Sequence, residues 1–216
     1  MKFKIFAVGM LVIGILAGCG TEADTENKTE STSNSTEQKQ EKKVSNQKGL
    51  GQVGEYGKVT VISEAEPFVL EGNENVNYEL SDVKVIKLED YTEDGEWGLL
   101  WATGAEDVEQ LPESVYAVIG TEAKTNKTDV SIEFTGVHTM VAGTEQVDII
   151  MDDFALEDEG GSTMLSGVEM DGQFAVIIEN PEVDSLKFVL SNAFDSETFS
   201  TDFLTEQEIE LPLTKK

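Results

Sequence analysis

The most reactive side chain in the sequence is the thiol of Cys19, the only cysteine among 216 residues. One cysteine cannot form an intramolecular disulfide. Together with the single histidine, it cannot supply the four ligands of a structural zinc site. Thiolate chemistry requires an accessible sulfur. Because Cys19 directly follows the apolar stretch from Ile5 to Leu16, the chemistry of this thiol depends on what that stretch does.

The first 18 residues have the layout of a secretory signal peptide. Lys2 and Lys4 precede about 12 apolar residues, which are too few to span ~30 Å of hydrocarbon comfortably. These residues are apolar on all sides, unlike a buried core helix with one polar face. Leu16-Ala17-Gly18-Cys19 resembles the lipobox of bacterial lipoproteins, in which the thiol receives a diacylglycerol and the chain is cut between Gly18 and Cys19. This resemblance implies a membrane partner bound through Cys19, since two acyl chains suffice for stable anchoring.

Side chains suited to nucleophilic catalysis are sparse. His138 is the only histidine, and it lies in a strand-like stretch from Phe134 to Val141. Ser162 and Ser166 lie near glycines, but neither belongs to a Gly-x-Ser-x-Gly elbow, and no Walker-type glycine loop is present. Serines in turns are common. We therefore predict a structural or surface role for His138, no catalytic residue, and no cofactor.

Carboxylates cluster near the middle of the domain, at Asp152, Asp153, Glu157, Asp158 and Glu159. Calcium takes six to eight oxygen ligands from flexible loops, but the spacing matches no EF-hand loop. Because the domain is rich in acids, such clusters arise by chance, and a solvated surface is the favoured interpretation. We therefore predict no metal site, with calcium binding as the alternative. The same reasoning applies to the paired acids Glu89 and Asp90 as glycosidase candidates.

Trp97 and Trp101 flank two leucines in one short segment. Aromatic side chains that are exposed on a loop are typical anchors for a protein or a glycan. Packing at the edge of a sandwich core is the plainer interpretation. The pair is retained as a candidate partner-binding site, with an envelope protein or glycan as the expected partner.

Three zones must position these residues. Residues 19–50 follow the signal peptide and are almost all polar, so they cannot bury enough surface to fold and are predicted to form a disordered stalk. Residues 51–216 hold eight of the 15 lysines and 37 of the 43 acids, a net charge of −29. This excess repels nucleic acid and anionic lipid. The chain also has no arginine, so it lacks the guanidinium group that binds phosphate and carboxylate through two parallel hydrogen bonds.

Alternation of apolar and polar residues predicts an all-β domain from residue 51 to residue 216. Clear period-two segments occur at 130–134, 186–190 and 208–213, and each predicts a strand with one buried face. The apolar positions switch parity across Ser81-Asp82, which predicts a β-bulge. Residues 115–119 are apolar throughout, as in a central strand covered on both sides. Seven or eight short strands are expected to form an antiparallel β-sandwich.

Turn signals add three local predictions. Asp171-Gly172 lies between two apolar segments, 164–170 and 173–178, and predicts a tight hairpin. Asn180-Pro181 is expected to end the second strand of that hairpin. The spacing of Thr103 and Glu106 fits a capping box, which predicts one short helix through Gln110 that ends before Pro112.

Several segments resemble a family of immunoglobulin-like domains found on lipoproteins of Gram-positive bacteria. The family is similar in fold to a secreted mycobacterial antigen sandwich, and its function is not established. The matching segments are Tyr116 to Asp129, Gly143 to Gln146, Ser166 to Glu169 continuing to Asn180-Pro181, and Leu186 to Leu190. The resemblance covers roughly residues 57–213 and implies no catalytic residues. The segment 95–114, which holds both tryptophans, is longer than the family pattern.

These observations predict an extracellular immunoglobulin-like β-sandwich. It would be held on the outer face of the bacterial cytoplasmic membrane by Cys19, and it would bind or scaffold an envelope partner without catalysing a reaction. Two alternatives remain at this point, namely a calcium-dependent adhesion module and an envelope hydrolase with two carboxylates of unlike pKa.

Overall fold

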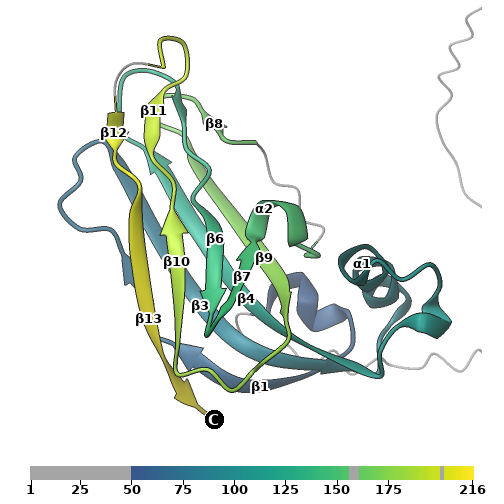
Figure 1. The fold of residues 1–216 in the computed structure, drawn as a ribbon. Helices are drawn as coiled ribbons and strands as arrows, with labels where there is room; N and C mark the ends of the chain where they lie inside the picture. Colours follow the sequence, from purple (N-terminus) through teal and green to yellow (C-terminus); the bar gives the residue numbers. More distant parts are fainter. Residues whose placement is uncertain (1–49, 156–160, 200–201) are drawn as a thin grey trace, which may run out of the picture. The chain divides into compact units, whose positions relative to one another are not determined.

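The computed structural model describes residues 50–155, 161–199 and 202–216. All of them belong to one compact unit. Antiparallel strands dominate this unit, as the alternating pattern predicts (Figure 1). In chain order the elements are η1 (Gly51–Glu55), β1 (Lys58–Ala65), β2 (Phe68–Val69), β3 (Val76–Glu89), α1 (Glu93–Thr103), η2 (Val108–Gln110), β4 (Ser114–Asn126), β5 (Ile132–Glu133), β6 (Val137–Ala142), β7 (Glu145–Asp148), α2 (Ile149–Asp152), β8 (Thr163–Met164), β9 (Glu169–Ile178), β10 (Ser185–Leu190), β11 (Ala193–Asp195), β12 (Asp202–Leu204) and β13 (Gln207–Lys215).

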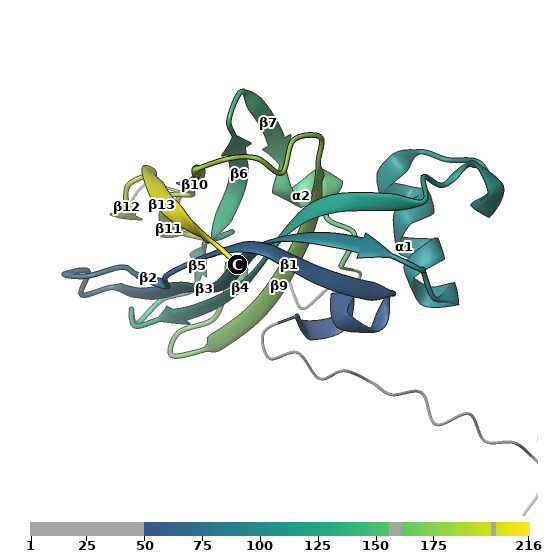
Figure 2. The same ribbon diagram turned by 90° about the horizontal axis from the view of Figure 1, so that it is seen from below.

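The main sheet has the strand order β7-β6-β10-β13-β1-β3-β4-β9, with β2 attached to β3. Strand β13 joins its two halves, because residues 207–212 pair with β10 and residues 213–215 pair with β1. The halves face each other across one apolar core. Figure 2 shows the layer of β1, β3, β4 and β9 with β6 and β7 on one side of it. A smaller sheet has the order β12-β11-β5-β8. The prediction of an all-β antiparallel sandwich is confirmed.

The structure has 13 described strands, whereas seven or eight were predicted, and one predicted turn is absent from the described residues. Seven of the described strands have six residues or more, and the others are shorter. The hairpin predicted at Asp171-Gly172 is wrong, since both residues lie inside the continuous strand β9 and pair with Ala123 and Glu122 of β4. Ten consecutive pairings with β4 outweigh the local turn preference. Strand β9 ends at Ile178, just before Asn180-Pro181, as expected.

The short helix predicted through Gln110 is present as the 3-10 helix η2, and the α-helix that precedes it was not predicted. The α-helix covers residues 93–103, and only a 3-10 turn follows at 108–110. Asp107 caps this turn by accepting from the N–H of Gln110 at 3.1 Å, whereas the sequence suggested a capping box that begins at Thr103. The predicted bulge is confirmed, because the register of β3 against β4 shifts between Ser81 and Lys84, and Asp82 has a φ of 50°.

Strand β4 lies between β3 and β9 and is covered on both faces, as predicted. Val118 faces the main core, whereas Ala117 and Ile119 face a second, smaller core on the outer side of the sheet. Two polar side chains of β4 are buried, those of Glu122 and Asn126. Glu122 is only 8% exposed, and its Oε1 accepts from the hydroxyl of Tyr78 at 2.6 Å and from the N–H of Val137 at 2.8 Å.

Candidate functional site

Helix α1, which carries both tryptophans, begins at Thr92. The Thr92 hydroxyl oxygen accepts from the N–H of Gly95 at 3.3 Å, so it satisfies one of the free amides of the first turn. Glu93, Asp94 and Glu96 place negative charge at the same end, where the helix dipole favours it. The helix ends at Gly104, whose φ of 66° fits the left-handed conformation common after a helix.

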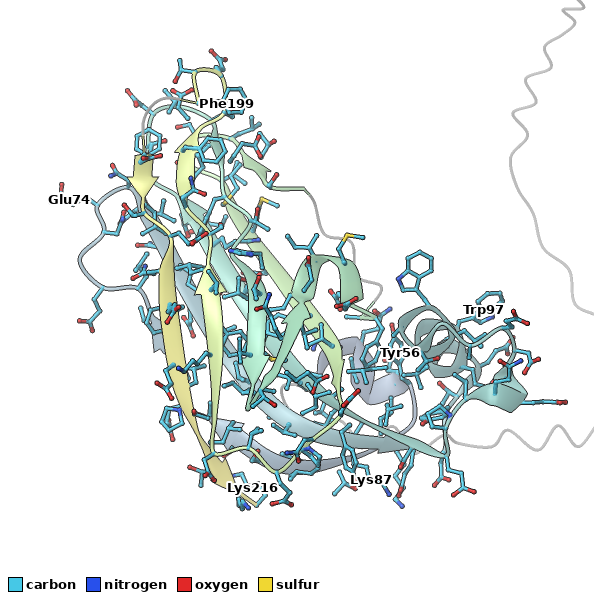
Figure 3. All side chains as sticks on the ribbon, in the orientation of Figure 1. Tyr56, Glu74, Lys87, Trp97, Phe199 and Lys216 are labelled. Carbon is cyan, nitrogen blue, oxygen red and sulfur yellow. The ribbon has the colours of Figure 1, made fainter. Side chains whose placement is uncertain are left out.

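Trp97 and Trp101 are one turn apart on the outer face of α1. Their exposed fractions are 68% and 73%, whereas Leu99 on the inner face is completely buried. Residues four apart share one side of a helix, so the two indoles form a single exposed surface. The prediction of core packing for this pair is therefore wrong, and the alternative, aromatic side chains open to a partner, matches the structure. Figure 3 shows Trp97 on α1, far from Glu74 and Phe199.

A close contact fixes α1 against η1. A Cβ added to Gly95 would lie 2.0 Å from the carbonyl oxygen of Tyr56, so only glycine fits at this position. The same carbonyl accepts from the N–H of Thr92 at 2.7 Å, and the Thr92 hydroxyl donates to the carbonyl of Glu55 at 2.8 Å. Helix α1 is thus held rigidly beside η1, so its outer face is a preorganised surface.

The smaller core anchors this helical layer on the sheet. Tyr56 is buried, donates its hydroxyl to the carbonyl of Ala155 at 2.7 Å, and packs against Phe154 with ring centroids 6.3 Å apart. Figure 2 shows η1 on the side of the sheet opposite β6. The buried members of this core are Leu50, Val53, Tyr56, Ile86, Leu88, Leu99, Val115, Ala117, Ile119, Phe154, Ala155 and Ala175.

A shallow hollow opens beside Trp97, where η1 meets α1. Its volume is about 200 Å³, and its lining residues are Gln52, Glu55, Tyr56, Asp94 and Trp97. The lining therefore combines one exposed indole with two carboxylates. Such a combination is suited to a cation, which an aromatic face and a carboxylate both attract.

A second groove of about 500 Å³ lies between the end of β3 and the segment 108–114. Within it, Glu89 accepts from Lys58 at 2.5 Å and also pairs with Lys87. Hydrogen bonds from these two lysines lower the pKa of Glu89 to about 2. Glu89 is thus held as the ion-pair partner of two lysines, and Asp90 lines the same groove.

The residues considered for nucleophilic catalysis are engaged elsewhere. Ser162 donates to Glu133 at 2.6 Å, and Ser166 donates to the carbonyl of Thr128 at 2.7 Å. His138 lies half-buried on β6, with Nδ1 2.9 Å from the Thr139 hydroxyl and Nε2 3.6 Å from a carboxylate oxygen of Glu206. These contacts place the imidazole and the two serines in separate interactions, so they do not assemble into a nucleophile and its base.

The candidate calcium cluster is only partly within the described residues. Asp153 accepts from the N–H groups of Ala155 and Ala175, both at 2.8 Å, and burial raises its pKa. Asp152 accepts from the N–H of Asp148 at 3.3 Å. Glu157, Asp158 and Glu159 lie outside the described residues. Within the described ranges, no group of three or more His, Cys, Asp or Glu side chains is arranged to hold a metal ion.

Gly18 and Cys19 of the predicted lipobox, and most of the predicted stalk, also lie outside the described residues. In the part of the chain that is described, none of the helices combines the length and the apolar character that crossing a bilayer requires.

Three residues beside Trp97 were missed by sequence reasoning, namely Gln52, Glu55 and Asp94. One signal could have located the helix that carries Asp94, because Thr92 followed by Glu93, Asp94 and Glu96 is a typical helix N-terminus. No pattern in the sequence brings η1 to this helix, since the contact depends on the packing of Tyr56.

The described residues define an all-β antiparallel sandwich with an added helical layer. No protein-family model matches the chain, and no curated protein matches it. Among solved structures, the chain is similar to a functionally unknown protein from Listeria monocytogenes EGD-e, with a TM-score of 0.50 and 11% sequence identity. The match covers 74% of this chain and 89% of that one. At this identity the likeness concerns the fold.

Proposed function

We propose that the chain is a lipid-anchored extracellular domain that binds or scaffolds a partner at the bacterial cell envelope and catalyses no reaction. The observation that carries the binding role is the exposure of Trp97 and Trp101 on a rigidly held helix. Large aromatic side chains are the residues that most often dominate the energy of protein interfaces. A soluble domain gains no stability from exposing two indoles, so a binding role is the economical explanation for them.

The anchoring role rests on the sequence around Cys19. Its thiol directly follows the signal-like apolar stretch and is the only thiol of the chain, and Leu16-Ala17-Gly18-Cys19 has the lipobox pattern. The folded domain carries strong negative charge, which repels anionic headgroups. A covalent lipid on Cys19 would hold such a domain at the membrane despite this repulsion.

The anchor can be tested with Cys19→Ser in the full chain, expressed in a Gram-positive host. The serine hydroxyl cannot accept the lipid by thiolate chemistry, so we expect the variant to leave the membrane fraction. Detergent-phase partitioning of cell extracts measures this change. Thr21→Ser, two residues downstream, is the matched control and should stay in the detergent phase. Equal partitioning of Cys19→Ser and the unmodified chain would refute lipid anchoring.

The binding surface can be tested with Trp97→Ala and Trp101→Ala in the chain from residue 20 to residue 216, which keeps every described residue. Because both indoles are exposed, each substitution should change the free energy of unfolding by less than about 0.5 kcal/mol. Retention of envelope extract, with wall glycan included, should fall sharply. Urea denaturation and pull-down measure the two quantities.

The control for this test removes apolar surface elsewhere. Leu165→Ala and Val69→Ala act on side chains that are 62% and 54% exposed and lie outside α1. These variants should retain envelope extract as the unmodified chain does. The proposal fails if the tryptophan variants lose several kcal/mol of stability and still retain the extract, since the indoles would then be structural.

A further inference from the structure

The proposed binding surface has a chemical preference that its lining residues reveal. We infer that the hollow beside Trp97 receives a lysine or arginine side chain from a basic protein partner. The inference rests on the proposed binding function and adds the class of the partner. It starts from the shape of the surface, since the exposed indole of Trp97 forms one wall of a hollow of about 200 Å³ and does not lie on a flat face.

The walls of the hollow have one sign of charge. Glu55 from η1 and Asp94 from α1 both line it, and neither takes part in the ion pairs that the described lysines form with Glu89, Asp82, Glu122, Glu182 and Glu64. Around it, the segment from residue 93 to residue 113 contains seven acids and no lysine. This charge repels phosphate and anionic lipid and attracts a cation.

The aromatic wall favours the same ligand. A guanidinium or ammonium group over an indole face is attracted by the negative potential of the ring, and the attraction is largest for tryptophan. The aliphatic stem of lysine or arginine can lie along Trp101, one turn further, because long basic side chains bury their methylene groups on apolar surface. One partner residue can therefore satisfy both the carboxylates and the indoles.

Hydrogen bonds and close packing fix the two elements that form the hollow. Thr92 joins η1 to α1 through its N–H and hydroxyl, at 2.7 and 2.8 Å, and the contact of Gly95 with Tyr56 leaves no space for the helix to shift. Binding therefore requires little ordering of the protein, which reduces the entropic cost of association. Figure 3 shows Tyr56 and Trp97 on the same side of the folded unit.

The test uses a synthetic peptide of repeated Arg-Gly-Ser units as the probe and the chain from residue 20 to residue 216. Both tryptophans of the chain lie on α1, so indole fluorescence reports on this surface alone. The arginine peptide should change the emission and bind measurably by calorimetry. A matched peptide with glutamine in place of arginine, and an oligomer of N-acetylglucosamine, should do neither. A response to the sugar oligomer with none to the arginine peptide would overturn the inference in favour of a glycan.

Variants show whether the arginine peptide binds in the hollow or is attracted to the acidic surface in general. Glu55→Gln combined with Asp94→Asn should weaken binding of the arginine peptide about tenfold, and Trp97→Ala about tenfold as well. Trp97→Phe keeps an aromatic face and should restore part of the loss. Glu71→Gln combined with Glu74→Gln removes the same charge from the exposed segment between β2 and β3, and should change affinity less than about twofold. Equal losses in the two double variants would overturn the inference.

The outcome also distinguishes the inference from the binding function on which it rests. If the arginine peptide fails to bind while Trp97→Ala still abolishes retention of envelope extract, the partner is not basic and the binding function stands. If Trp97→Ala leaves both measurements unchanged, the inference and the binding surface fail together.

Discussion

Glu122→Ala is expected to lower the free energy of unfolding by about 4 kcal/mol. The carboxylate accepts two hydrogen bonds inside the core, from Tyr78 at 2.6 Å and from the N–H of Val137 at 2.8 Å. Its removal leaves both donors without this acceptor, and a buried unsatisfied donor costs about 1–3 kcal/mol. Lys124, whose Nζ lies 3.9 Å from the second carboxylate oxygen, loses this ion pair and keeps its hydrogen bond to the carbonyl of Thr135. Urea denaturation measures the loss.

Two further variants define what this loss means. Glu122→Gln keeps an oxygen that can accept from Tyr78 and Val137, so it should lose about half as much stability as Glu122→Ala. Glu79→Ala removes an exposed acid from β3, directly before Leu80, which pairs with Glu122, and should change stability by less than about 0.5 kcal/mol. If Glu122→Ala is no more destabilising than Glu79→Ala, the buried network contributes nothing to stability.

The same carboxyl group predicts a pH dependence. Burial raises the pKa of Glu122 in the folded protein, so the folded state holds this proton more tightly than the unfolded chain, whose glutamate pKa is about 4.3. Where the folded state binds more protons, stability falls as pH rises. From about pH 4.3 upward, the unmodified chain should therefore lose stability relative to Glu122→Gln, until pH passes the raised pKa. Parallel pH profiles would contradict this assignment.

Gly95→Ala should lower the free energy of unfolding by about 2–3 kcal/mol, although alanine is the better helix former. Helix propensity alone predicts a gain of about 1 kcal/mol. The added methyl would lie 2.0 Å from the carbonyl oxygen of Tyr56, and overpacking of this kind costs about 1–3 kcal/mol or more. The carbonyl of Tyr56 cannot move easily, because it accepts a hydrogen bond from the N–H of Thr92. The Tyr56 hydroxyl also donates to the carbonyl of Ala155, which holds the residue in place.

The sign of the change is the informative part of this experiment. Gly172→Ala in β9 is the control, because a Cβ there meets no atom within 4 Å. Thermal denaturation should show a lower melting temperature for Gly95→Ala and little change for Gly172→Ala. The indole emission of Gly95→Ala should change too, since the helix that carries Trp97 and Trp101 must shift. A higher melting temperature for Gly95→Ala would show that α1 is not seated on η1.

Local sequence was sufficient for features whose cause is local. The bulge at Ser81-Asp82 could be predicted because apolar residues must return to the same face of β3 after the irregularity. The central position of residues 115–119 followed from their apolar character on both faces. The strand at 208–213 followed from strict alternation. In each case the burial of side chains imposes a pattern that can be read along the chain.

The hairpin prediction was wrong, and helix α1 was missed, for reasons that involve distant residues. Asp171-Gly172 has the composition of a tight turn, but β9 keeps extended geometry there because it pairs with Ala123 and Glu122. Helix α1 shows little periodicity, since glycines occupy buried positions where apolar side chains would be expected. One of them, Gly95, allows close approach to η1, a segment about 40 residues earlier in the chain.

The sequence alone determined the all-β class and the zone in which the negative charge resides, and it carries the lipobox-like segment at Cys19 on which the proposed anchor rests. These features depend on composition, alternation and short contiguous motifs. The tertiary structure decided that Trp97 and Trp101 are exposed, and that Glu55 and Asp94 lie beside Trp97. The physical reason is that exposure depends on which face of a helix is packed, and here the contact of Gly95 with Tyr56 turns the indoles outward.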